Sequence, residues 1–300
     1  MRAAVIDVGT NSVKLYIAER TGGTALLDVG EACRITRLGA GICGGMLQAE
    51  AMARTAQAVA DFAKEALQKD AEQLACVGTM ALRQAENAQS FFDRVHALCG
   101  VDVRVLSGEE EARLCYRAAL MDVQGEKGTL AVIDSGGGST EIALGSAASP
   151  QMRASLPIGA VSVTETYLRP FATAEALDNA QAAMRTAFAR SGICPRAQTV
   201  VAAGGTATTM AAVMLRLAPY DAKKVRGVLL TLAEAQRQRA LYASLTPQQR
   251  ALLPGMHSGR EDVILAGACI LLQAFEYFNV DCLRVVDRGL RHALALEMLD

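Results

Sequence analysis

The stretch Leu130–Glu141 reads LAVIDSGGGSTE, and its pattern decides how the rest of the chain is interpreted. A short apolar run ends in the carboxylate of Asp134, which predicts a buried strand with an acid at its end. Glu141 adds a second carboxylate. The small residues between them allow a tight turn with exposed amides and hydroxyls; they are Gly136, Gly137, Gly138, Ser139 and Thr140. A glycine triplet alone is most often a plain turn, so the stretch is only a candidate corner for phosphate and metal.

The N-terminus carries the same pattern. Ala3–Asp7 is apolar and ends in a carboxylate, and Val13–Ala18 alternates like the returning strand of a hairpin. The turn between them offers the side chains of Thr10, Asn11 and Ser12. Because a repeated corner is harder to explain as coincidence, we predict two similar α/β domains, each with one phosphate-binding hairpin. Asp7 and Asp134 would then hold Mg²⁺ directly or through waters, although either acid alone would suit a strand end.

Composition and charge narrow the class of protein. Three hundred residues with 51% hydrophobic and 20% charged side chains predict a folded chain of two packed domains. The formal net charge of -1, with acids and bases interspersed, provides no general basic field for nucleic acid. Met1 leads almost directly into the first strand, and the apolar segment Val263–Leu272 is too short to span a bilayer. We therefore expect a cytoplasmic protein that does not associate with membranes.

The cysteine and histidine patterns do not indicate a metal site. Eight cysteines are scattered without a Cys-x-x-Cys pair, which favours buried free thiols over disulfides or a zinc site. The three histidines, His96, His257 and His292, are equally dispersed. We expect them on the surface or at helix ends.

A glutamate-rich helix start lies between the two corners. Ser107 and Glu110 have the spacing of a capping box, which predicts that Glu110 caps the helix and that Glu109 faces solvent. Glu111 is one position further around the first turn and has no local structural task. A carboxylate near a helix N-terminus is kept ionised, which suits a base that accepts a proton near neutral pH. Glu111 is therefore a candidate general base.

Other basic and glycine-rich positions are candidate contacts for an anion. Arg83 precedes a helix for which Asn87 is the expected N-cap, and the free amides of a helix start also favour anions. The segment Gly204–Thr209, which includes Gly205 and Thr206, suits either a third anion site or a tight turn that packs a helix on a strand. Arginines near loops are usually solvated, but four of them are candidates for substrate contact: Arg34, Arg37, Arg288 and Arg291.

Together these motifs resemble those of the exopolyphosphatase and guanosine pentaphosphate phosphohydrolase family, within the acetate kinase, sugar kinase, Hsp70 and actin superfamily. They occur in family order across nearly the whole chain, which is far more specific than any single glycine motif. The matching segments are Asp7–Ser12, Gly78–Ala85, Ser107–Leu114, Asp134–Glu141, Leu156–Ala160, Gly204–Thr209 and Gly289–Arg291.

The resemblance implies an α/β fold of two ribonuclease-H-like domains with the active site in a cleft between them. We expect one domain of residues 1–121 with the C-terminal helix 287–300, and a second of residues 122–286. The implied reaction is the Mg²⁺- or Mn²⁺-dependent release of terminal orthophosphate from inorganic polyphosphate. Glu111 resembles the family's catalytic base, which would activate a water for in-line attack on the terminal phosphorus.

The resemblance also implies roles for the corners. Asp7, Asp134 and Glu141 resemble the acidic group that binds the metal and positions water. Arg83 would act as a second catalytic residue by stabilising charge on the phosphoryl oxygens. The expected phosphate-binding residues are Thr10, Asn11, Ser12, Gly136, Gly137, Gly138, Ser139, Thr140, Gly205, Thr206, Arg37 and Arg291.

Two features depart from the family pattern. Long members carry an additional C-terminal helical portion of the HD type, and this chain stops after the terminal helix, which argues against high processivity on very long polyphosphates. After Gly289–Arg291 the chain has His292 and Ala293 where the family usually has a small or acidic residue and a glycine. That exchange leaves the local backbone less free.

The same corners would serve other ligands. Hydrolysis of the 5′ γ-phosphate of pppGpp is the nearest alternative, and a sensor that binds (p)ppGpp or polyphosphate without turnover is another. A kinase of the superfamily is disfavoured by the glutamate-rich motif at Ser107 and by the lack of a recognisable sugar-binding segment. A homodimer is compatible with the family, although no patch in the sequence argues for one.

Overall fold

The computed structural model describes the whole chain except residues 22–25, 43, 124–127 and 147–148. The described residues form two compact units, one of residues 1–114 with 290–300 and one of residues 115–289. We call them unit 1 and unit 2 and describe each by itself. The division falls within helix α4 (Gly108–Asp122), and the last helix, α12 (Leu290–Leu299), belongs to unit 1.

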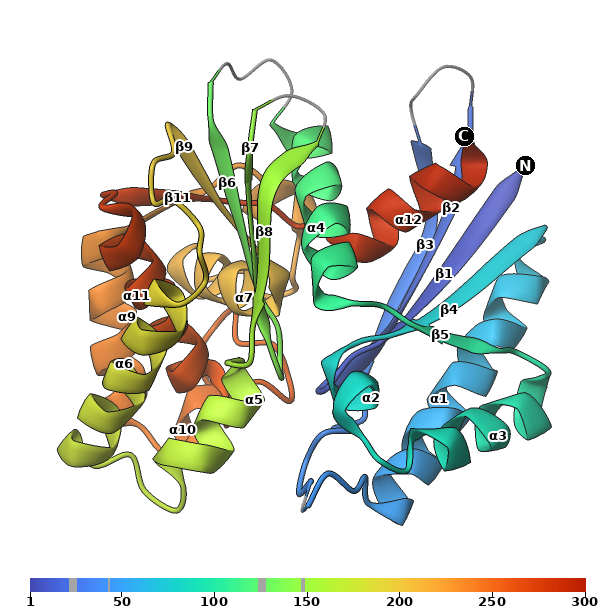
Figure 1. Cartoon of the computed structure of the whole chain (residues 1–300), viewed down its shortest axis with the longest axis horizontal. Helices are drawn as coiled ribbons and strands as arrows, with labels where there is room; N and C mark the ends of the chain where they lie inside the picture. The colour runs from blue at the N-terminus through green and yellow to red at the C-terminus, as the bar shows by residue number, and fades with distance from the viewer. Residues whose placement is uncertain (22–25, 43, 124–127, 147–148) are drawn as a thin grey trace. The chain divides into compact units, whose positions relative to one another are not determined.

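Unit 1 is built on a five-stranded mixed sheet in the order β3-β2-β1-β4-β5 (Figure 1). The strands are β1 (Arg2–Val8), β2 (Ser12–Arg20), β3 (Leu26–Ile35), β4 (Gln73–Gly78) and β5 (Val103–Val105). Antiparallel pairing joins β1 to β2 and β2 to β3, whereas β1, β4 and β5 are parallel. The other helices of this unit are α1 (Ala49–Gln68), α2 (Met80–Gln84) and α3 (Ala88–Cys99).

Alternation along the strands gives this sheet two different faces. Leu15 and Ile17 of β2 belong to the hydrophobic core that includes α1 and α3. Tyr16 points to the opposite face, where α12 packs against β1 and β2. Asp7 and Lys14 pair across β1 and β2, and Lys14 lies two residues from Tyr16. These two charged residues therefore lie on the face that α12 covers in part.

Unit 2 contains a six-stranded sheet in the order β10-β11-β9-β6-β7-β8. The strands are β6 (Leu130–Ser135), β7 (Thr140–Gly145), β8 (Pro150–Leu156), β9 (Thr199–Ala203), β10 (Leu229–Thr231) and β11 (Cys282–Val285). The helices after α4 are α5 (Ala160–Val163), a π-helical turn (Thr164–Leu168), α6 (Ala174–Ala189), α7 (Gly204–Met214), α8 (Ala222–Val225), α9 (Leu232–Ser244), α10 (Pro247–Ala251) and α11 (Ile264–Phe278). Three consecutive antiparallel strands followed by parallel ones repeat the topology of unit 1. The repeat and the α/β fold class that the sequence predicts are confirmed.

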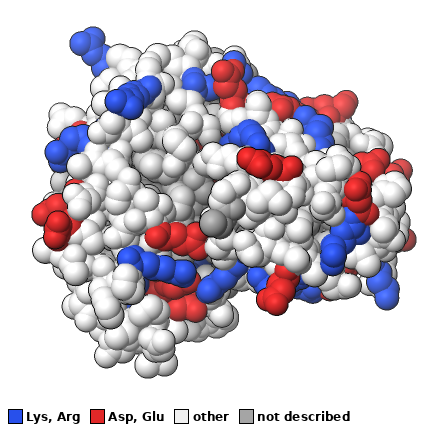
Figure 2. Space-filling view, turned by 60° about the horizontal axis from the view of Figure 1, so that its bottom comes forward, with Lys and Arg blue, Asp and Glu red and all other residues white. Residues whose placement is uncertain are grey.

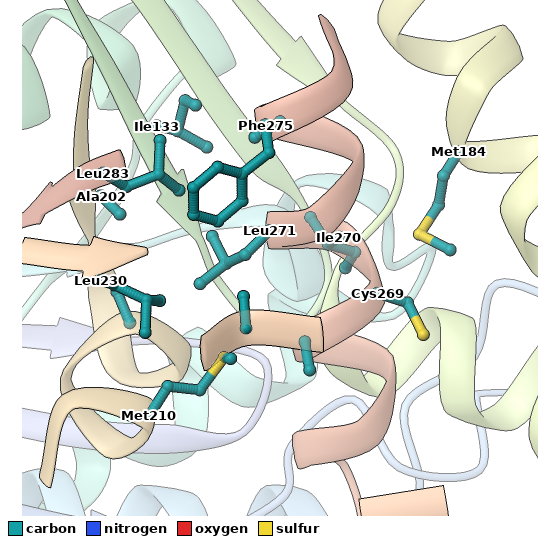
Figure 3. Close-up of a cluster of buried hydrophobic side chains, with 14 of the residues drawn as sticks. Ile133, Met184, Ala202, Met210, Leu230, Cys269, Ile270, Leu271, Phe275 and Leu283 are labelled. Atoms are coloured by element: carbon teal, nitrogen blue, oxygen red, sulfur yellow. The ribbon is translucent and has the colours of Figure 1, made fainter. Parts of the chain in front are cut away.

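The core of unit 2 lies between its sheet and the helices α6, α7, α9 and α11. Figure 3 shows Leu271 and Phe275 of α11 pointing toward the strand residues Ile133, Ala202 and Leu283. Because Ile133 faces these helices, its neighbour Asp134 faces the other side of the sheet. The carboxylate of the glycine-rich hairpin is thus kept off the apolar side of the sheet.

Two expectations about single residues are wrong. His292 is not at the surface but 1% exposed, with its ring 4.2 Å from that of Tyr16, because α12 packs on β2. Asn87 makes no side-chain cap; its amide group instead exchanges hydrogen bonds of 2.9 and 3.0 Å with the backbone of Leu47. Both contacts join segments far apart in the sequence, so local patterns do not reveal them.

The cysteines agree only in part with the expectation of buried free thiols. Cys43 lies outside the described residues, and the other seven are free. Cys76, Cys115 and Cys269 are buried, whereas Cys33, Cys194 and Cys282 are exposed.

Charged side chains of both signs are interspersed on the face shown in Figure 2. This distribution agrees with the formal net charge of -1 and provides no extended basic surface on that face. Within the described parts of the chain, no helix is both long and apolar enough to cross a membrane.

Candidate phosphate-binding site

Two hairpin turns, one in each unit, have the same backbone arrangement and carry most of the candidate phosphate-binding residues. We call Gly9–Ser12 the N-terminal turn and Gly136–Ser139 the glycine turn. In each, the amide of the first glycine donates a 2.9 Å hydrogen bond to the carbonyl of the serine, at Ser12 and Ser139. The agreement confirms that the two sequence motifs fold alike.

The carbonyl groups of the N-terminal turn are bound from behind by the segment that follows β3. The amides of Thr36 and Arg37 donate to the carbonyl of Asn11 at 3.1 and 2.9 Å, and the amide of Gly39 donates to that of Thr10 at 2.9 Å. A Cβ at Gly39 would lie 2.3 Å from Cγ2 of Thr10. Glycine is therefore required for this close approach, and the predicted phosphate ligand Arg37 lies directly behind the turn.

The glycine turn is bound from behind in the same way by the start of α5. The amides of Ala160 and Val161 donate to the carbonyls of Gly136 and Gly137 at 2.9 and 2.8 Å. A Cβ at Gly159 would lie 2.4 Å from the carbonyl oxygen of Gly137. The motif Leu156–Ala160 thus has a physical task, which is to hold the outer side of the glycine turn.

The carbonyl groups of the two turns accept the hydrogen bonds described above, whereas some of the hydrogen-bond donors at the turns have no acceptor. Among the residues that the structure describes, no hydrogen bond uses the amides of Gly137 or Gly138. Nδ2 of Asn11 and Oγ of Ser135 are buried and also lack a hydrogen-bond partner within the described chain. Buried polar groups without partners are rare in folded proteins, and consecutive free amides form a concave anion site. The two turns therefore have the chemistry of phosphate-binding loops.

The carboxylates at the glycine turn are held by specific contacts. Sγ of Cys115 donates to Oδ2 of Asp134 at 3.0 Å, and Oγ of Ser155 donates to Oε1 of Glu141 at 2.8 Å. Gly204 has φ +86°, and a Cβ there would lie 2.2 Å from Oδ1 of Asp134. Asp134 and Glu141 are also paired across β6 and β7, so the two acids are neighbours on one face of the sheet.

Hydroxyl groups at the turns differ in what they can contact. Thr10, Ser12 and Ser139 are at least 92% buried within their turns. Thr140 is fully buried, and its hydroxyl donates to the carbonyl of Ile158 at 2.7 Å. The structure thus gives the hydroxyl of Thr140 an acceptor inside the fold.

The predicted base and the predicted catalytic arginine lie together in unit 1. Glu111 is 4% exposed, and its Oε1 forms an ion pair with Nη1 of Arg83. The same nitrogen of Arg83 donates to the carbonyl of Leu106 at 2.7 Å, which anchors the guanidinium to the start of α4. A buried carboxylate with an arginine partner is a typical feature of a functional site.

The other glutamates of this helix start behave as the spacing predicts. Glu110 forms the capping box, since its amide binds Oγ of Ser107 at 3.1 Å and its carboxylate binds the amide of Ser107 at 3.3 Å. Glu109 is exposed. The sequence therefore predicted the capping and the solvent-facing glutamate correctly, and the structure adds that Glu111 is buried.

The start of α7 has a basic residue that the sequence motifs did not indicate. A Cβ at Gly205 would lie 1.7 Å from Nη2 of Arg260, so the guanidinium rests directly on this glycine. The hydroxyl of Thr209 donates to the carbonyl of Gly205, 2.6 Å away, and lies 3.2 Å from Nδ1 of His257. Thr206 is buried against Gly267 of α11. Arg260 lies in a loop without a motif, and only the fold reveals its proximity to the glycines.

The arginines near the chain end are engaged in ion pairs. Nη2 of Arg291 lies 2.7 Å from Glu31 of β3, and Arg288 lies 3.1 Å from the buried Asp122. Arg34, the remaining candidate, pairs with Asp61.

A metal ion is implied by the resemblance, and the residues at the glycine turn fit one. Within the described chain, no group of three or more His, Cys, Asp and Glu side chains is arranged to hold a metal alone. Mg²⁺, however, is usually bound through one or two carboxylates together with waters and substrate phosphates. The cross-strand pair of Asp134 and Glu141 beside free amides meets that requirement.

Comparison with known proteins agrees with this geometry. The model of the Ppx/GppA phosphatase family matches residues 16–300. The chain belongs to the Ppx/GppA phosphatase family. It is 34% identical to "Exopolyphosphatase 2" of Mycobacterium tuberculosis, with 99% of this chain and 98% of that protein covered. The resemblance inferred from the motifs is therefore confirmed, as is the prediction of a phosphoric anhydride hydrolase at the level of the family.

Other family relatives carry a different name. The chain is 28% identical to the "Guanosine-5'-triphosphate,3'-diphosphate pyrophosphatase" of Aliivibrio fischeri, covering 99% of this chain but 59% of that protein. The crystal structure of the Aquifex aeolicus family member matches with a TM-score of 0.84 at 33% identity, covering 100% of this chain and 97% of that one. These Ppx/GppA relatives support the two-domain α/β fold and leave the substrate open.

Proposed function

We propose that this Ppx/GppA phosphatase is an exopolyphosphatase that releases terminal orthophosphate from inorganic polyphosphate. The observation that carries the proposal is the pair of turns with bound carbonyls and free amides, since such turns bind phosphate without regard to a nucleoside. A relative that matches over nearly its full length is named an exopolyphosphatase, which supports the choice of substrate.

The proposed chemistry rests on a buried base and fixed donors. Glu111 would take a proton from the attacking water, and its ion pair with Arg83 holds the carboxylate in place. The amides of Gly137 and Gly138, with the side chain of Asn11, would bind phosphoryl oxygens. Because these donors are already oriented by the fold, they stabilise negative charge without reorganisation.

Asp134 and Glu141 would hold Mg²⁺ or Mn²⁺ together with Asp7, directly or through waters. When bound, the ion would neutralise charge on the phosphate oxygens. The contacts from Cys115 and Ser155 orient the two acids of unit 2. Such contacts are typical of groups that support metal-binding carboxylates.

Orthophosphate release from polyphosphate with Mg²⁺ tests the proposal directly. Glu111→Gln keeps the size and hydrogen-bonding capacity of the side chain but removes the base, so kcat should fall by about 10²- to 10⁴-fold. Glu109→Gln is the matched control, because Glu109 lies on the same helix turn but is exposed. No release by the native protein, or equal release by Glu111→Gln, would contradict the proposal.

Hydrolysis of the 5′ γ-phosphate of pppGpp is the second candidate, favoured by the name of the relatives at 28–30% identity. The ratio of kcat/KM values for polyphosphate and pppGpp distinguishes the two reactions. Tight binding of either ligand without turnover would instead indicate a sensor, and phosphate transferred to ADP or a sugar would indicate a kinase.

The proposal also includes the cellular compartment and the oligomeric state of the enzyme. Seven described cysteines are free, which fits the reducing cytoplasm in which we propose that the enzyme acts. Light scattering on the purified chain would test whether it forms the homodimer that the family resemblance suggests.

A further inference from the structure

A pocket on the helical side of unit 2 has no part in the proposed reaction. It has a volume of about 520 Å³ and is formed by α6, α9, α11 and the segment that leads into β11. Its lining residues are Gln181, Arg185, Leu232, Gln236, Arg239, Leu272, Phe275, Glu276, Asn279, Val280 and Asp281. We call it the three-helix pocket. Its size lies within the range of small-molecule sites.

The three-helix pocket is remote from the proposed phosphate site. Asp281 lies just before β11, which is parallel to β9, whereas the glycine turn and Gly204 follow the far ends of β6 and β9. The pocket also lies on the side of the sheet that the helices cover, opposite to the side that Asp134 faces. A ligand in this pocket would therefore bind at a second site.

The wall of the pocket combines apolar and polar groups. Leu232, Leu272 and Val280 are partly exposed and supply apolar surface, whereas Phe275 is 2% exposed and points into the core. Figure 3 shows that Phe275 belongs to the same helix, α11, as Cys269. The amide of Gln236 is exposed at the wall. Such a wall suits a ligand with a flat or branched apolar body.

The charges of the pocket are not equivalent. Arg185 and Glu276 pair with each other, 3.3 Å apart, and are both largely exposed. Asp281 is exposed, whereas Arg239 is half-buried, and its positive charge acts on the nearby thiol of Cys269. Within the described chain Arg239 has no carboxylate partner. A half-buried guanidinium without an acid is less screened than exposed charges, so it attracts an anion more strongly.

We propose that the three-helix pocket binds a small organic anion, with the acidic group on Arg239 and the apolar body against Leu272 and Val280. This inference goes beyond the proposed function and does not depend on it. A carboxylate, phosphate or sulfonate would satisfy the guanidinium through charge-assisted hydrogen bonds, while burial of the body provides the remaining affinity.

Two fluorescent probes with the same aromatic body test the proposal. 1-Anilinonaphthalene-8-sulfonate carries an acidic group, and N-phenyl-1-naphthylamine lacks it. The native protein should bind the sulfonate about tenfold more tightly than the neutral probe, because one charge-assisted hydrogen bond typically supplies that difference. Equal affinities would overturn the proposal.

Variants then locate the binding site. Arg239→Gln should remove the preference for the sulfonate, whereas Arg237→Gln, on the same helix but paired with Glu234 and outside the pocket, should keep it. Gln236→Trp should fill the pocket and abolish binding of both probes. Asp281→Asn should leave sulfonate binding unchanged or stronger. Sulfonate binding that survives both Arg239→Gln and Gln236→Trp, in variants with native circular dichroism and melting temperature, would overturn the proposal.

Discussion

The N-terminal turn and the glycine turn share a backbone but differ in the side chains that accompany it. Each is closed by a glycine amide, and each is bound from behind by a segment that contains a glycine, Gly39 or Gly159. The strand register then places Lys14 opposite Asp7, but Glu141 opposite Asp134. One turn is accompanied by an acid and a cation, the other by two acids.

This difference in charge leads us to expect that the two hairpins, although alike in architecture, differ in their need for a metal ion. Two neighbouring carboxylates repel each other and an approaching phosphate unless a cation lies between them. We therefore expect phosphate binding at the glycine turn to need a metal ion, whereas Lys14 would supply positive charge beside the N-terminal turn. In this proposal backbone amides would bind phosphate in both units, and the residue opposite the aspartate, Lys14 or Glu141, would decide whether a metal ion is needed.

The largest expected effect is on the metal dependence of the reaction. Glu141→Gln should raise the Mg²⁺ concentration required for half-maximal phosphate release by about 10- to 100-fold, a range typical of damage to a metal site. Lys14→Gln should raise KM for polyphosphate and shift the Mg²⁺ requirement much less than Glu141→Gln does, because Lys14 lies opposite Asp7 and outside the pair of Asp134 and Glu141. If Lys14→Gln shifts the Mg²⁺ requirement as much as Glu141→Gln does, the two hairpins do not differ in their need for a metal ion.

The segments behind the turns should respond differently to the same substitution. Gly159→Ala drives a Cβ into the backbone of Gly137, at 2.4 Å, which cannot move without loss of the turn. Gly39→Ala drives it into the methyl group of Thr10, at 2.3 Å. Overpacking typically costs 1–3 kcal/mol, so both urea midpoints should fall, and that of Gly159→Ala should fall further.

A second substitution provides the control for the glycine experiment. Thr10→Ser removes the methyl group and keeps the hydroxyl, so it should restore most of the stability lost in Gly39→Ala. The chain offers no equivalent rescue for Gly159→Ala, because the obstacle there is backbone. If Thr10→Ser fails to restore stability, the close approach of Gly39 is not the reason that glycine occupies this position.

Two histidines, the partly buried His257 and the buried His292, extend the comparison to acid stability. Burial and the nearby positive charge of Arg260 lower the pKa of His257 in unit 2 to about 4. In unit 1 burial raises the pKa of Glu31, but the hydrogen bond from His292 and the charge of Arg291 outweigh it and lower the pKa to about 2. One histidine thus lies beside a cation and the other beside an acid.

Unit 2 should therefore lose stability first as the pH falls. The unfolded chain protonates His257 near its ordinary pKa of 6.5, whereas the folded chain does so only near 4, so stability decreases through this interval. The contribution of Glu31 is lost only below its ordinary pKa of 4.5 and down to about 2. His257→Gln should flatten the decline of the urea midpoint between pH 6.5 and 4, and substitution of the exposed His96 should not. An unchanged slope in His257→Gln would show that other groups determine the acid sensitivity.

The sequence predicted those parts of the site that depend on neighbouring residues. Both turns were found because consecutive small residues follow an apolar run, and the capping box distinguished Glu110 from the buried Glu111. The position of Arg260 on Gly205 depends on the packing of distant segments, and so does the burial of His292 under Tyr16. Neither the spacing of apolar residues nor a short sequence motif predicts such contacts, so they are seen only in the folded structure.

Substitution of Thr140 has the smallest expected effect. Thr140 and its counterpart in the N-terminal hairpin occupy equivalent positions but differ in their side chains. The sequence predicts its hydroxyl as a phosphate ligand, but the structure directs it to the carbonyl of Ile158 at 2.7 Å. Val13 occupies the corresponding position in the N-terminal hairpin. It pairs with Val8 across the two strands, as Thr140 pairs with Ser135. Thr140→Val should therefore lower the free energy of unfolding by about 1 kcal/mol, the usual value of one buried hydrogen bond, and leave kcat/KM nearly unchanged. A large loss of kcat/KM with unchanged stability would instead return Thr140 to the phosphate site.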